Sequence, residues 1–168
     1  MTEHLARRAV IALGANLGDP IAALQGATDA LNADADTQVI AASHVYQSDP
    51  VGGVEQPVFC NAVVIVRTDR EPGELLALAH RIEQDWHRTR EVRWGPRTLD
   101  LDLIDVEGVT SDDTALTLPH PRAHERGFVI VPWREIDPEG RLTGHGPINA
   151  LPVDTAGVRA TDRRLSIQ

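Results

Sequence analysis

Two aspartates that alternate along a predicted strand are the residues of this sequence best suited to chemistry. Asp100 and Asp102 lie in the apolar run Leu99 to Val106. Residues two apart on a strand point to the same face, so both carboxylates project together, about 7 Å apart, while the intervening leucines face a core. Such a pair raises its own pKa values unless a cation sits between them. The spacing favours Mg²⁺ bound with substrate phosphates, although a solvent-facing pair on an edge strand has the same spacing.

A cluster of positive charge precedes the two aspartates. Four arginines lie within ten residues: Arg88, Arg90, Arg93 and Arg97. The guanidinium fork matches phosphate oxygens and keeps its charge at neutral pH, so the cluster indicates phosphate binding. The alternative is a solvated surface on which these arginines pair with Glu83, Asp85 and Glu91. The neighbouring aspartates favour the phosphate interpretation.

The composition excludes several functional classes. All 16 basic residues are arginine, a bias that a GC-rich genome would explain, so neither a Walker A loop nor a protein-kinase strand lysine can be present. The net charge of −9 argues against nonspecific nucleic-acid binding. The single Cys60 forms no internal disulfide, and no apolar run is long enough to span a membrane. We therefore expect a cytoplasmic protein that acts on small-molecule substrates.

Other residues suited to a binding site lie on both sides of the aspartates. His120 stands between two prolines, a rigid setting that could present its ring to a phosphate, and Arg126 follows. A single histidine is nevertheless usually an ordinary hydrogen-bonding residue. Phe59 and Phe128, the only phenylalanines, read as core residues on composition alone. Asn61 would face the same side as Phe59, and a heterocycle with an amide-like edge would satisfy its side chain.

The patterns predict alternating strands and helices over one domain, residues 1–168. We expect strands at 8–13, 37–46, 59–67 and 99–106. Asp19-Pro20 and Pro72 open two helices, the second losing its apolar periodicity in a loop at 87–93. This order predicts an α+β, ferredoxin-like βαββαβ core. A short helix or turn is expected around 124–135, and the tail after Pro147 has a weak pattern, as a loose segment would.

Four segments together resemble a known family. The run Arg93-Trp-Gly-Pro-Arg-Thr-Leu-Asp-Leu-Asp-Leu-Ile104 is similar to the signature of the 6-hydroxymethyl-7,8-dihydropterin pyrophosphokinases of the folate pathway. Three weaker segments follow the family in order: 12–18, 46–61 and 118–128. The likeness spans residues 8–135. It implies a ferredoxin-like fold and transfer of pyrophosphate from ATP to the pterin hydroxymethyl group, with release of AMP.

The resemblance also implies roles for individual residues. Asp100 and Asp102 would bind two Mg²⁺ ions, and Arg88 and Arg97 would stabilise charge during transfer. Phosphates of ATP, the co-substrate, would be held by Arg90, Arg97, His120 and Arg126. The pterin ring would lie between Phe59 and Phe128, and its pocket would also contain Asn16, Ser48, Val51, Asn61 and Trp94. Glu83 matches a family position without a clear role. A monomer is the simplest expectation.

Several positions depart from the family pattern, and two other functions stay open. His87 replaces a glycine, Phe59 a tyrosine, Pro121 an aromatic residue and Asp49 a proline, which affects affinity and loop kinetics more than the reaction class. A palm-like nucleotidyl transferase would also use an aspartate pair, but the acidic charge disfavours it. A ligand-sensing domain of the same fold would not need the arginine cluster.

Overall fold

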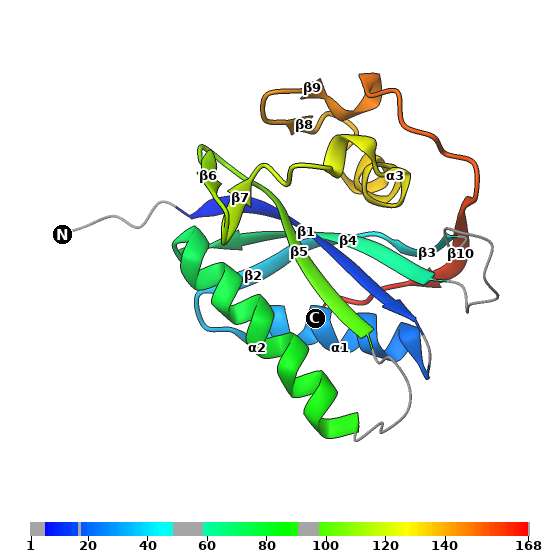
Figure 1. Cartoon of the computed structure of the whole chain (residues 1–168). Coiled ribbons are helices and arrows are strands. Elements are labelled where there is room, and N and C mark those ends of the chain that lie inside the picture. Colours follow the sequence, from blue (N-terminus) through cyan, green and yellow to red (C-terminus); the bar gives the residue numbers. More distant parts are fainter. Residues whose placement is uncertain (1–5, 17, 49–58, 91–97, 168) are drawn as a thin grey trace.

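A single antiparallel sheet separates two helical layers (Figure 1). The computed structural model describes residues 6–16, 18–48, 59–90 and 98–167. In those ranges the sheet contains β1 (Arg7–Asn16), β2 (Thr37–Ala42), β3 (His44–Ser48), β4 (Phe59–Thr68), β5 (Thr98–Val106) and β10 (Val158–Arg164). Its order is β10-β3-β4-β1-β5, with β2 also beside β4. This is the strand order of the expected ferredoxin-like core, extended by β10.

Two helices cover one face of the sheet and a third covers the other (Figure 1). Helix α1 (Pro20–Ala33) begins as predicted, with Asp19 accepting a hydrogen bond from Ala22 N at 3.0 Å, and α2 (Pro72–Arg90) packs beside it. Helix α3 (Gly127–Ile136) follows the 3-10 helix η1 (Ala123–Glu125). The remaining elements are β6 (Ser111–Asp113), β7 (Leu116–Leu118), β8 (Arg141–Leu142), β9 (Gly146–Pro147) and the 3-10 helix η2 (Ile148–Ala150).

The chain has a hydrophobic core on each face of the sheet. The larger core lies under α1 and α2 and contains Leu13, Leu24 and Leu99, each at most 2% exposed. The smaller lies under α3, where Trp133 packs with Val63 and other sheet residues. Alternation along each strand supplies both cores, because successive side chains point to opposite faces. No helix among the described residues is long and apolar enough to cross a bilayer.

Two expectations about the elements were wrong. The strand predicted over 37–46 is interrupted at Ser43, which separates β2 from β3. Residues 87–90, predicted as loop, continue α2, since neither proline nor glycine interrupts them and arginine is a good helix former. The tail after Pro147, expected to be partly loose, also contains a strand that was not predicted, because β10 pairs with β3 and forms the sheet edge. The short helix expected near 124–135 exists as η1 and α3.

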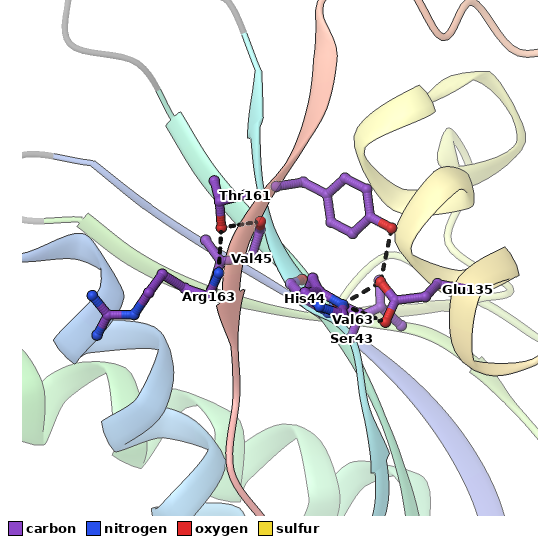
Figure 2. A network of polar contacts seen from close by, with 8 residues as sticks. Ser43, His44, Val45, Val63, Glu135, Thr161 and Arg163 are labelled. Carbon is purple, nitrogen blue, oxygen red and sulfur yellow. Dashed lines mark hydrogen bonds and ion pairs between the residues drawn. The ribbon is translucent and has the colours of Figure 1, made fainter.

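A polar cluster fastens α3 to the interruption between β2 and β3 (Figure 2). The Glu135 carboxylate accepts hydrogen bonds from Tyr46 Oη at 2.8 Å and from His44 N at 3.1 Å, and lies 2.9 Å from His44 Nδ1. Beside it, Ser43 Oγ accepts from Val63 N at 3.0 Å. Burial and the Glu135 charge raise the pKa of Tyr46, so the hydroxyl stays a donor.

The Glu135 cluster predicts the effect of removing one hydroxyl group. Tyr46→Phe should lower the free energy of unfolding by about 1–2 kcal/mol, because it deletes a buried hydrogen bond to a carboxylate while keeping the ring. Urea denaturation measures this loss. Thr117→Val removes an exposed hydroxyl bond to Asp113 O and should change stability by less than about 0.5 kcal/mol. Equal losses in both variants would contradict the role assigned to the cluster.

Candidate active site

The two aspartates lie side by side on β5, as their spacing predicts. In the antiparallel pairing with β1, Asp100 is opposite Gly14 and Asp102 is opposite Ala12. Directly paired residues share a face, and Ala12 belongs to the core under α3, so both carboxylates point to the α3 side. Asp100 is exposed and Asp102 half-buried. The alternating leucines 99, 101 and 103 are buried at 1%, 3% and 5% exposure under the opposite face.

The donor set beside β1 fits a magnesium ion that also binds substrate. The β1 residues opposite the two carboxylates, Gly14 and Ala12, have the smallest side chains, and Ala12 is itself buried in the smaller core. The described residues contain no group of three histidine, cysteine, aspartate or glutamate side chains that could hold a metal ion. Mg²⁺ commonly uses one or two carboxylates and takes its other oxygens from water and phosphates. Two carboxylates therefore fit Mg²⁺ only together with further oxygens from water or phosphate.

A bulge in β5 brings His120 beside the aspartates. Leu103 pairs with Ile11 and Asp105 with Val10, which leaves Ile104 as an extra residue. The Ile104 carbonyl accepts a hydrogen bond from His120 N at 2.8 Å. No local pattern indicates this bulge, because Ile104 continues the apolar run.

The His120 ring is suited to donate a hydrogen bond as a neutral group. Burial lowers the pKa of His120, the Asp102 charge raises it, and the Arg126 and Arg122 charges lower it further. The Nδ1 atom accepts from Arg122 N at 3.2 Å, which leaves the ring hydrogen on Nε2. The charges of Asp102 and Arg126 thus both act on the His120 ring.

The polar residues continue in a row from Asp100 across neighbouring strands of the sheet. Gly14 pairs with Asp100 on one side and with Asn61 on the other. Asn61 is 5% exposed, and its Nδ2 atom donates to Ser48 Oγ at 2.8 Å. Ser48 in turn pairs with Phe59. The predicted common face of Asn61 and Phe59 therefore lies in line with the aspartates.

The two phenylalanines are less buried than core residues would be. Both are half-buried. Phe128 lies in the first turn of α3, and the Arg126 guanidinium carbon is 5.6 Å from the centre of its ring. Phe59 belongs to neither hydrophobic core within the described part of the chain. Phe128 packs at the border of the smaller core, so both rings are partly buried and partly exposed.

The tail adds a wall to this region that the sequence did not indicate. A cavity of about 240 Å³ is lined by Ser48, Arg126, Phe128 and, from the tail, Asp154 and Val158 among others. Gly127 begins α3 against the Asp154 carbonyl with no room for a Cβ atom. No local sequence pattern in the tail predicts β10. The contribution of the tail to the cavity lining follows only from the pairing of β10 with β3.

The side chains of five predicted site residues are not among those that the structure describes. Val51, Trp94 and Arg97 lie outside the described residues, and for Arg88 and Arg90 only the helical backbone is described. Asn16 ends β1, is 7% exposed and lies two residues from Gly14, so it shares the face of the aspartates.

Comparison with known proteins identifies the same family as the motifs. Residues 10–138 match the model of 7,8-dihydro-6-hydroxymethylpterin-pyrophosphokinase. A 2-amino-4-hydroxy-6-hydroxymethyldihydropteridine pyrophosphokinase of Mycobacterium tuberculosis is 44% identical, covering 90% of this chain and 88% of the relative. The enzyme of the same name from Methylorubrum extorquens is 39% identical, covering 92% and 99%.

The solved structures agree on the fold. A Plasmodium falciparum HPPK-DHPS structure with pteroate superimposes with a TM-score of 0.68 at 14% identity, covering 90% of this chain. This chain spans only 42% of that longer chain. The resemblance stated from the sequence and the predicted ferredoxin-like fold are both confirmed. The chain belongs to the 7,8-dihydro-6-hydroxymethylpterin-pyrophosphokinase family.

Proposed function

We propose that this chain transfers pyrophosphate from ATP to the hydroxymethyl group of 6-hydroxymethyl-7,8-dihydropterin, in folate biosynthesis, and releases AMP. The placement of Asp100 and Asp102 on β5, in one row with Asn61 and beside His120, is the observation that supports this most. The names of the relatives supply the substrate class. The acceptor region and the phosphate region then meet over Gly14.

The phosphate half of the site contains the charged residues. Asp100 and Asp102 would hold two Mg²⁺ ions, whose chemistry is to neutralise and orient the triphosphate. Arg126 and neutral His120 donate hydrogen bonds to phosphate oxygens, as does Arg90 at the end of α2. Arg88 and Arg97 stabilise the charge that develops during transfer.

The acceptor half contains the aromatic and amide groups. Phe59 and Phe128 stack on the two faces of the pterin, while Asn61 recognises its polar edge. The bond from Asn61 Nδ2 to Ser48 Oγ holds the amide in one orientation before substrate arrives. Asn16, Val51 and Trp94 complete this pocket in the proposal.

The reaction needs positioning more than a dedicated base. The pterin hydroxyl oxygen forms a bond to the β-phosphorus of ATP, and the bond from that phosphorus to the α–β bridging oxygen breaks. AMP leaves with this bridging oxygen, and the hydroxyl proton passes to solvent. Holding both substrates on one sheet face lowers the entropic part of the barrier.

The cellular setting follows from the same proposal. The substrates are small molecules, with no role for nucleic acid or a membrane. We propose a cytoplasmic monomer whose residues 1–168 form a single catalytic domain.

The proposed reaction is tested by its products. The protein is incubated with MgATP and hydroxymethyl dihydropterin, and the nucleotide product is identified by chromatography. AMP together with the pterin pyrophosphate is expected. ADP would indicate an ordinary kinase instead, and no turnover would leave a binding protein; either result contradicts the proposal.

Removing one metal-binding carboxylate should abolish most turnover. Asp102→Asn should lower kcat by about a hundredfold or more, because the lost charge no longer holds a metal ion at the triphosphate. Steady-state assays across a range of Mg²⁺ concentrations measure the effect. Asp112→Asn changes an exposed aspartate on the β6 hairpin and should leave kcat unaltered. Near-normal turnover of Asp102→Asn would show the metal assignment to be wrong.

The proposed stacking role of Phe59 predicts different KM values for two substitutions of this residue. Phe59→Ala should raise the KM for the pterin by about tenfold, since stacking of a base on an aromatic ring contributes about 1–3 kcal/mol. Phe59→Tyr keeps the ring and should leave this KM within about twofold. The KM for ATP serves as the internal control and should not change in either variant. If both variants had the same pterin KM as the native protein, Phe59 would be a structural residue only.

A further inference from the structure

Glu83, for which the sequence offered no role, contacts the strand that carries the aspartates. It lies on α2, is half-buried, and its Oε2 atom accepts a hydrogen bond from Leu101 N at 2.8 Å. The helix is fixed at this point because Ile82, the preceding residue, is 7% exposed in the larger core. Glu83 therefore reaches β5 from a helix whose own position is set by packing.

The bond satisfies an amide that the sheet leaves without a strand partner. In the described sheet β5 is an edge strand and pairs only with β1 (Figure 1). The Leu101 N–H points outward along this edge, and a partly buried amide needs an acceptor. A carboxylate is a strong acceptor for such an amide. Glu83 thus takes the place that a neighbouring strand would otherwise occupy.

Leu101 is the residue between the two aspartates. Its side chain is 3% exposed and packs in the larger core, while Asp100 and Asp102 point to the other face. The bound N–H belongs to the peptide that joins Asp100 to Leu101. The bond to Glu83 fixes the Leu101 nitrogen, and packing in the larger core fixes the Leu101 side chain. Together these two contacts fix the twist of β5 at this residue. The directions of both carboxylates depend on this twist.

The charges of the two aspartates also act on Glu83. Burial raises the pKa of Glu83, the Leu101 amide lowers it, and the Asp100 and Asp102 charges raise it further. Glu83 is therefore close enough to both aspartates for their charges to interact. Glu83 therefore lies on the α2 side of β5, behind Asp100 and Asp102.

We propose that Glu83 is a positioning residue, which orients Asp100 and Asp102 for Mg²⁺ by holding the Leu101 amide at the sheet edge. The inference rests on the proposed metal-binding role of the two aspartates. Groups that support metal ligands from behind commonly change metal affinity by 10–100-fold when they are removed. Glu83 would do this through the backbone rather than through a ligand side chain.

Three substitutions of Glu83 distinguish the effects of its hydrogen-bond acceptor, its negative charge and the length of its side chain. Glu83→Gln keeps an acceptor oxygen at the same distance, Glu83→Met keeps only the length, and Glu83→Asp keeps the charge on a shorter side chain. Titration calorimetry measures Mg²⁺ binding in the presence of α,β-methylene-ATP. Amide hydrogen exchange, followed by NMR, reports on Leu101 directly. The Met and Asp variants should lose protection at Leu101 and bind Mg²⁺ about tenfold more weakly.

Glu83→Gln should retain Leu101 protection and bind Mg²⁺ within about threefold of the native protein, because its amide oxygen accepts the same bond. A matched control is Asn32→Ala, which removes another bond from a helix side chain to a strand amide, Asn32 Oδ1 to Val39 N at 3.0 Å. It should leave Mg²⁺ binding unchanged.

Two results would overturn the role of Glu83. One is native Mg²⁺ affinity in Glu83→Met or Glu83→Asp despite rapid exchange at Leu101. The other is weaker Mg²⁺ binding in Glu83→Gln while Leu101 stays protected, which would show that the bond to Leu101 does not set the affinity. A failure of the underlying metal site looks different, since Asp102→Asn would then bind Mg²⁺ as well as the native protein. Should Glu83→Met not fold, the comparison of Gln with Asp carries the same test.

Discussion

The pairing of β5 with β1 is the constraint on which the proposed site depends. Its register places Asp100 and Asp102 opposite Gly14 and Ala12, which have the smallest side chains, on the α3 face of the sheet. The same strand places its leucines in the larger core, so shifting the register by one residue would bury both carboxylates. Stability and the proposed metal site therefore require the same alignment, and the hydrophobic core fixes the geometry of the polar face.

The rest of the fold can be understood as support for this strand. Helix α2 holds β5 from one side and contributes Glu83, while α3 covers the opposite face of the sheet and carries Phe128 in its first turn. The Glu135 cluster fastens α3 to β3 at the far side of the sheet. Phosphate-binding and ring-binding residues thus come from separate elements, but each is held by contacts outside the site. Such support is what keeps a binding geometry within narrow limits.

The sequence predicted what depends on local pattern. Alternation identified β5 and the common face of its aspartates, and Asp19-Pro20 located the start of α1. Long-range contacts decided the features that were missed. The interruption at Ser43 and the pairing of β10 with β3 both need partners distant in sequence. Glu83 falls in the same class, because nothing near it in the chain indicates that its carboxylate binds Leu101.

The proposed role of Asp100 and Asp102 is to hold the metal at the triphosphate. The most direct measurement is an anomalous difference map from crystals grown with Mn²⁺ and α,β-methylene-ATP. We expect two Mn²⁺ peaks between the nucleotide phosphates and the two carboxylates, each metal about 2.1–2.2 Å from a carboxylate oxygen of the pair. Nucleotide and metal bound elsewhere on the chain, with both carboxylates uncoordinated, would contradict the account.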